Sequence, residues 1–106
     1  MIETSKSDWK LFRERVGSWQ EHYMEKLLKQ YIDIIGAPGK ASERFWELER
    51  IIMEDRKHPG VILDLRKSDA IYDIVALIKQ KVITMEELDG FSEELVDAVK
   101  QMVSRF

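Results

Sequence analysis

The chain has 106 residues, of which 44% are hydrophobic and 35% are charged, and it contains no cysteine. This size and balance fit one folded domain over residues 1–106 and argue against a disordered chain, a disulfide framework or a thiolate metal site. A run of about 18 apolar residues is absent, which excludes a membrane-spanning helix, and Met1–Lys10 lacks the apolar stretch of a secretory signal. We therefore expect a soluble cytoplasmic domain.

The net charge of −3 is unevenly distributed along the chain. Residues 84–106 carry six acidic side chains against only Lys100 and Arg105. An acidic segment is a poor ligand for nucleic acid, because neutralisation of phosphates dominates that affinity.

Capping residues and helix breakers divide the N-terminal third into predicted helices. A first helix over 8–16 can be capped by Ser7 or Asp8, and Gly17 interrupts it. A Ser-x-x-Glu capping box then opens a second helix over 18–35. The pattern leaves open whether these are two helices or one kinked helix.

The next breaker is the turn over 36–39, whose two glycines and one proline stop helix propagation. Ser42 can cap a third helix over 42–57, which ends at the His-Pro-Gly sequence of 58–60. The β-branched stretch 61–65 is either extended or the lead-in to the next helix, and its periodicity does not decide between them.

Three further helical elements are predicted in the C-terminal part. A fourth helix over 68–81 begins at Ser68, a capping box opens a single turn over 84–89, and a last helix runs from Ser92 nearly to the end. The resulting fold class is all-α: a compact bundle of four longer helices with one or two short ones.

The fourth helix is apolar almost all round, since Asp73 is the only charge within 70–78, which predicts a central position in the bundle. The last helix has one apolar stripe, formed by Leu95, Val99, Met102 and Phe106, and is expected to cover the core.

The second helix carries more apolar surface than one neighbour needs. Its two stripes are Trp19, Tyr23, Leu27 and Ile34, and Met24, Leu28, Tyr31, Ile32 and Ile35. The helix is therefore either sandwiched between others or left with a face for a partner.

The sequence Gly36–Ser42 resembles a phosphate-binding loop but departs from it in detail. That loop needs Ser or Thr directly after its lysine and a preceding strand, whereas Ala41 follows Lys40 and a helix comes first. We interpret it as a turn between helices.

The sequence contains no pattern typical of a metal site or a catalytic site. His22 and His58 are the only histidines and have neither Glu-x-x-His nor His-Glu-x-x-His spacing. Glu43, Glu47 and Glu54 share a helix face with interleaved arginines, which is typical of a solvated face. No nucleophile or acid–base pair stands out, so we expect neither an enzyme nor a bound cofactor.

The last three helical elements have the outline of a helix-turn-helix unit. A recognition helix reads DNA with basic and amide side chains, yet the last helix begins with Glu93 and Glu94 and adds Asp97. Binding of DNA is therefore an alternative and not the favoured function. Its basic candidates are Arg56, Lys57, Arg66 and Lys67.

Several short sequences point to a family. They are Leu11-Phe12-Arg13-Glu14-Arg15, Trp19-Gln20-Glu21, Tyr23-Met24-Glu25, Phe45-Trp46, His58-Pro59-Gly60-Val61 and Ile83-Thr84-Met85-Glu86-Glu87-Leu88. Through them the chain resembles a group of small uncharacterised bacterial proteins common in mobile elements, some of which carry a "multidrug transporter" label. That label conflicts with a chain that has no membrane-spanning segment. The resemblance implies a mobile-element setting, in which inhibitors of host defence nucleases occur, and it carries over no catalytic residue.

The function expected from these observations is that of an interaction or regulatory protein, acting on another protein or through self-association. The candidate contact residues lie on the second helix and in the acidic C-terminal segment: Trp19, Tyr23, Met24, Leu28, Tyr31, Glu93, Glu94 and Asp97.

Overall fold

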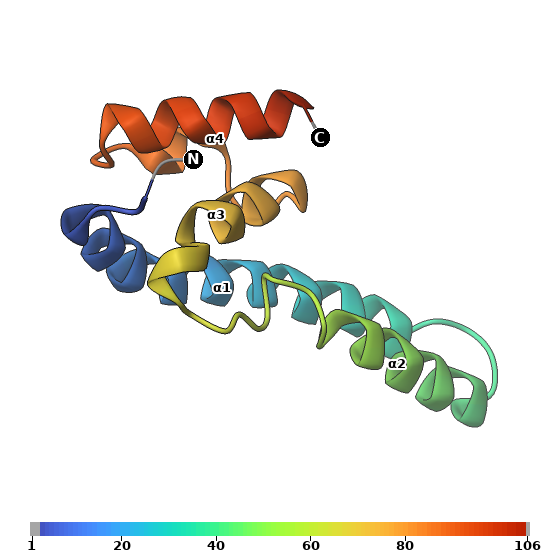
Figure 1. Ribbon diagram of the computed structural model, residues 1–106. Coiled ribbons are helices and arrows are strands. Elements are labelled where there is room, and N and C mark those ends of the chain that lie inside the picture. The colour runs from blue at the N-terminus through green and yellow to red at the C-terminus, as the bar shows by residue number, and fades with distance from the viewer. Residues whose placement is uncertain (1–2, 106) are drawn as a thin grey trace.

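The computed structural model describes residues 3–105, and it is all-α as predicted, with 73% helix. The described residues form four α-helices and no strand (Figure 1). The helices are α1 (Lys6–Ile35), α2 (Ala41–Asp55), α3 (Ala70–Lys79) and α4 (Glu93–Arg105), with the short 3-10 helices η1 (Lys67–Asp69) and η2 (Met85–Leu88) between them.

The N-terminal 30-residue segment is one continuous helix, so of the two alternatives that the sequence left open, two separate helices divided at Gly17 is the wrong one. A glycine costs a helix only about 1 kcal/mol, and the buried Val16 and Trp19 on either side of it pack into the same core. The helix begins at Ser5, whose hydroxyl accepts a hydrogen bond from the Asp8 amide, and neither Ser7 nor Asp8 is its cap. At 1.5 Å per residue α1 is about 45 Å long, which accounts for most of the 53 Å length of the molecule.

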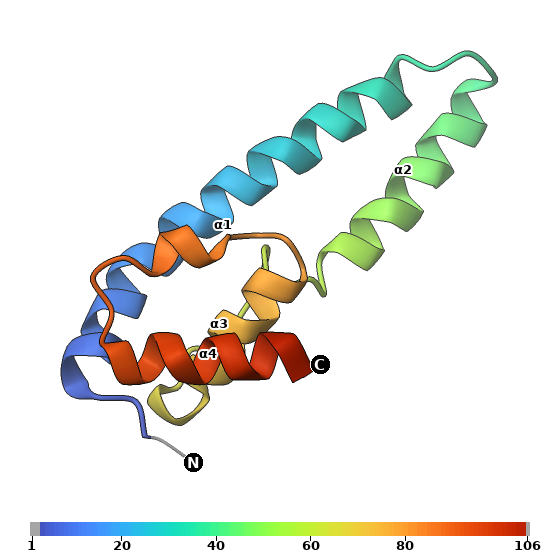
Figure 2. The same cartoon turned by 90° about the horizontal axis from the view of Figure 1, so that it is seen from above.

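The core occupies one end of the molecule, where α3 and α4 pack together over the N-terminal half of α1 (Figures 1 and 2). The predicted central helix is confirmed, since Ala70, Ile74 and Leu77 of α3 are fully buried. The predicted covering helix is confirmed too, because Leu95 and Val99 of α4 are buried against it, whereas Phe106 lies outside the described residues.

A buried carboxylate joins the starts of α1 and α4. Asp8 is only 4% exposed and accepts hydrogen bonds from both the amide (2.9 Å) and the hydroxyl (2.6 Å) of Ser92. Ser92 in turn accepts from the Leu95 amide and so caps α4, as predicted. Asp8 therefore holds the two helix starts together across 84 residues of sequence.

The turn before α4 is fixed by Arg15 of α1. Its guanidinium donates to the carbonyls of Glu87 and Asp89 and lies over the Phe91 ring at 5.3 Å. Gly90 has a φ of +95°, and a Cβ there would come within 2.9 Å of Arg15, so this position requires glycine.

The other end of the molecule is an arm. The C-terminal half of α1 turns through 36–40 and pairs antiparallel with α2, and the two helices extend away from α3 and α4 (Figure 2). None of the 15 residues of α2 is buried. One helix of the predicted bundle therefore lies outside the core.

The remaining boundaries differ from the predictions by a few residues. Residues 62–66 are neither strand nor helix. Ser68 does not begin α3 but lies within η1, which leads into that helix. Ser42 lies inside the first turn of α2, whose N-cap is Lys40, and Thr84 makes no side-chain cap. Polar side chains with local alternatives shift helix ends easily, which explains these differences.

Asp73 is the one acidic side chain on the inner helix α3. Its Oδ2 is buried and accepts no hydrogen bond within the described residues. Burial, and then the charges of Asp69 and Asp64, raise its pKa to about 6.

Candidate interaction surface

The base of the arm is clamped by residues 58–60. The His58 ring stacks on Tyr23 of α1 with ring centroids 4.6 Å apart, and the Gln20 amide donates to the Pro59 carbonyl. Gly60 lies flat against the Tyr23 ring, so close that a Cβ would come within 2.3 Å of it. The arm therefore leaves the core in a fixed direction.

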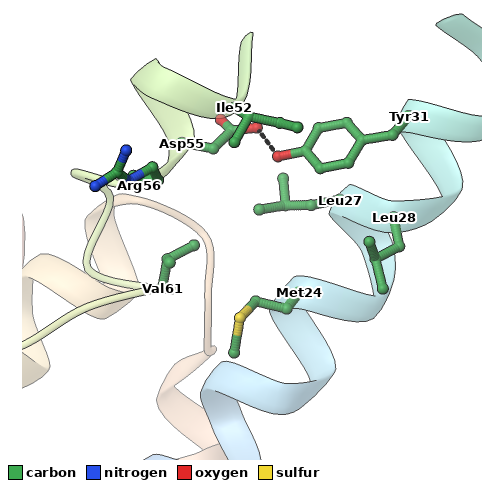
Figure 3. A pocket seen from close by; sticks show the side chains of 8 residues that line it. All are labelled: Met24, Leu27, Leu28, Tyr31, Ile52, Asp55, Arg56 and Val61. Carbon is green, nitrogen blue, oxygen red and sulfur yellow. Dashed lines mark hydrogen bonds between the residues drawn. The ribbon is translucent and has the colours of Figure 1, made fainter. Parts of the chain in front are cut away.

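An open groove of about 190 Å³ runs between α1 and α2 beyond this base (Figure 3). Its lining is mostly apolar: Met24, Leu27, Leu28, Tyr31, Ile52, Asp55, Arg56 and Val61. Sites for drug-sized molecules have about 300–1,000 Å³. The groove suits one or two side chains of a partner better than a free metabolite.

One polar contact bridges the two helices that line this groove. The Tyr31 hydroxyl donates to Oδ2 of Asp55 at 2.5 Å and links the two helices of the arm (Figure 3). Burial, the hydrogen bond to Asp55 and that carboxylate's charge together raise the pKa of Tyr31 to about 12. The phenol stays protonated at neutral pH and so keeps donating the hydrogen bond that joins the two helices.

A second groove of about 180 Å³ continues toward the tip of the arm and is lined by Ile35, Ala41, Arg44, Phe45 and Leu48. Met24, Leu28, Tyr31 and Ile35 follow each other at intervals of four, three and four residues, and so do Ala41, Phe45, Leu48 and Ile52. This spacing keeps each set on one side of its helix, so the two grooves lie on one face of the arm.

We call the exposed apolar side chains of the arm the arm face: Leu28, Ile32 and Ile35 of α1, Phe45 and Ile52 of the four-three-four series on α2, and beside them Trp46 and Met53, each one residue further along α2. Ile32, Phe45 and Trp46 are each more than 60% exposed. Monomeric proteins seldom leave so many large apolar side chains together in water, which makes the arm face the candidate contact surface.

The opposite flank of α2 is polar and internally paired. Arg50 forms ion pairs with Glu47 at 2.7 Å and with Glu54 at 2.9 Å. The hydrogen bonds and charge of Arg50 lower the pKa of Glu47. The interpretation of these acids as a solvated face agrees with this geometry, so the apolar side of α2 is the one without a partner.

The structure gathers part of the predicted contact set on the arm. Met24, Leu28 and Tyr31 line one groove, whereas Tyr23 is occupied by the clamp at the arm's base. The prediction for Trp19 is wrong, because Trp19 is buried in the core next to Phe12. Trp19 and Leu27 share one apolar stripe of α1, but α1 packs on α3 and α4 at one end and on α2 at the other. Residues of the same stripe therefore lie in different surroundings.

Sequence reasoning missed the contribution of α2. Its four-three-four spacing of apolar residues and the adjacent Phe45 and Trp46 were the available signal, but a helix of this pattern ordinarily covers a core. Only the placement of α2 outside the core exposes them.

The acidic candidates lie elsewhere. Glu93, Glu94 and Asp97 are exposed on α4, at the core end and away from the arm (Figure 1). Acidic residues in the first turn of a helix are favoured by its dipole, which accounts for Glu93 and Glu94 without a ligand.

The basic residues of the DNA alternative are not joined by any contact among the described residues. Arg56 lines the groove of the arm, and Arg66 pairs with Asp64 at 3.0 Å. Lys57 and Lys67 are exposed at separate turns. Two of the four therefore have local roles.

Within residues 3–105, no three or more His, Asp or Glu side chains gather as a metal site would require, and none of the helices has the length and apolarity to cross a bilayer. Comparison of the chain with protein-family models, curated proteins and solved structures finds no match. The arm face therefore has to be interpreted from its geometry.

Proposed function

We propose that this chain is a cytoplasmic protein-interaction module that binds another protein surface through the arm face. The observation that supports the proposal is α2, a helix with no buried residue that nevertheless presents Phe45, Trp46, Ile52 and Met53. Tryptophan and other large side chains of this kind dominate the binding energy of protein interfaces.

The energetics of the arm support the same proposal. Isolated helices of about 15 residues are marginal in water, and most helical stability comes from burying an apolar face. In the arm, α2 buries apolar surface only along the side that faces α1, where the Tyr31–Asp55 hydrogen bond joins the two helices. A partner on the arm face would bury the rest.

The test is site-specific photo-crosslinking in cells of the organism that encodes the chain. A photoreactive residue replaces Phe45 in one variant and Ile62, which is about equally exposed but lies outside the arm, in a control. We expect a discrete adduct from position 45 and none from position 62.

The adduct should disappear when Leu28→Ser and Ile52→Ser are added, because both side chains belong to the same face. No adduct from position 45, or equal adducts from both positions, would contradict the proposal.

A further inference from the structure

The size of the arm face matches what one partner of a stable complex buries. Its seven side chains are 36–65% exposed, which leaves roughly 700 Å² of apolar surface in water. A standard interface buries about 800 Å² per partner. The arm is also, in shape, half of a four-helix bundle: two antiparallel helices with an apolar groove between them.

Unpaired charges border this face. Glu25 and Lys29 lie beside Ile32 on α1, and Glu49 lies between Phe45 and Ile52 on α2. These three exposed charges form no ion pair among the described residues, in contrast to Glu47, Arg50 and Glu54 on the opposite flank. Arg56, one turn beyond Ile52, contacts only the Met53 sulfur at 3.5 Å through its guanidinium.

The two grooves show which parts of α1 and α2 lie at the same level along the arm. Arg56 lines the inner groove with Met24 and Leu28, which places it level with Glu25. Ile35 lines the outer groove with Phe45 and Leu48, so Glu49 lies within about one helical turn of the level of Lys29. The two pairs of opposite charges therefore lie within about one helical turn of each other along the arm.

We infer that the arm face binds a second copy of this chain, a conclusion that rests on the proposed function and names its partner. The two arms point the same way about a two-fold axis along their length, and α2 of each copy packs on α1 of the other. This arrangement brings Arg56 beside Glu25 of the second copy and Glu49 near Lys29 of the second copy, twice each by symmetry. Arms pointing in opposite directions would instead pack α1 on α1 and α2 on α2, and would set Arg56 against Glu49 rather than Glu25 of the second copy.

Sedimentation equilibrium over a range of concentrations tests the dimer. We expect a concentration-dependent monomer–dimer equilibrium for the unaltered chain. Leu28→Ser with Phe45→Ser should raise the dissociation constant at least about 30-fold, because interface energy concentrates in a few large side chains. Ile62→Ser is the matched control and should leave the equilibrium unchanged, since it exposes an equivalent side chain outside the arm.

Charge reversal tests the arrangement. Arg56→Glu alone should raise the dissociation constant about tenfold, and adding Glu25→Arg should restore it to within about threefold. Lys100→Glu, an exposed reversal on α4, should have no effect. Circular dichroism of each variant in dilute solution should show unchanged helix content.

Failure of this inference differs from failure of the proposed function. A chain that stays monomeric at every concentration, a dimer that survives the Leu28 and Phe45 substitutions, or an Arg56→Glu defect that Glu25→Arg does not restore would each overturn the inference. A position-45 adduct of a mass other than that of two chains would then keep the proposed function and assign the face to a different protein. A monomer with no adduct would overturn both.

Discussion

Both ends of this molecule carry large apolar side chains, but the core end buries most of its own, whereas on the arm only Leu27 is buried among the described residues. At the core end Phe12, Ile74 and Leu77 are inaccessible to water, whereas Ile32 and Trp46 on the arm remain mostly exposed. The N-terminal half of α1 lies in the core and its C-terminal half lies in the arm, and the two halves are similar in composition. Apolar content alone therefore does not tell a surface that the fold buries from one that it leaves exposed, and the number of helices packed around a segment does.

The largest expected contrast between the two ends comes from placing a charge on each. Ile74→Asp puts an unpaired carboxylate into the centre of the core and should cost several kcal/mol of an unfolding free energy of about 5–15 kcal/mol, leaving the chain mostly unfolded. Ile32→Asp, in protein dilute enough to be monomeric, should change the unfolding free energy by no more than about 0.5 kcal/mol.

Denaturant unfolding followed by circular dichroism measures both changes. A normal transition for Ile74→Asp would mean that α3 is not central, and unfolding by Ile32→Asp would mean that the arm is part of the core.

A second contrast uses two tryptophans. Trp19→Ala removes a ring packed against Phe12 and Phe91 and should cost about 3–5 kcal/mol. Trp46→Ala removes a ring that is 64% exposed and should cost about 1 kcal/mol or less in the monomer. Equal losses of unfolding free energy in urea would show that the core and the arm are packed alike.

The joint between core and arm gives a smaller effect. Gly60→Ala drives a methyl group into the Tyr23 ring, which is held by stacking on His58, and should cost about 1–3 kcal/mol. Gly17→Ala meets no atom within 4 Å and should stabilise the helix by about 0.5–1 kcal/mol. Thermal melting of the two variants should therefore shift in opposite directions, and a neutral Gly60→Ala would show that the base of the arm yields readily.

The smallest effect concerns Asp73, the acidic side chain of α3. Because the pKa of Asp73 is raised from 3.8 to about 6, the folded chain keeps a proton that the unfolded chain loses between these pH values. The contribution of Asp73 to the unfolding free energy therefore falls as the pH rises from about 4 to about 6 and is constant at higher pH. Asp73→Asn should remove that slope and stabilise the protein at pH 7 by about 1 kcal/mol, a value reduced for partial solvent screening.

Unfolding at pH 4, 5, 6 and 7 measures this slope. Asp97→Asn on the exposed side of α4 is the control and should leave the slope as it is. A slope that persists in Asp73→Asn would assign it to another group.

The all-α class and the burial of α3 and α4 were predictable from the sequence, because they follow from local patterns. The density of apolar residues over 70–78 admits only a central position, and the Phe91–Ser92 sequence predicts the start of α4. Helix type and amphipathic faces depend on contacts between residues a few positions apart, and a sequence displays those directly.

Two features were decided by tertiary structure alone: the exposure of the arm and the hydrogen bonds by which Asp8 joins the starts of α1 and α4. The position of Asp8 in the sequence is typical of a residue that caps its own helix. Because α1 begins one turn earlier and is capped by Ser5, the Asp8 carboxylate is left to accept hydrogen bonds from Ser92. The apolar stripe of α2 is compatible with a core position, and it is exposed because α3 and α4 already cover the N-terminal half of α1 and leave no third layer over the arm. Which of several apolar faces is buried depends on the total number of faces that compete for one small core, and that competition is a property of the whole chain rather than of any segment.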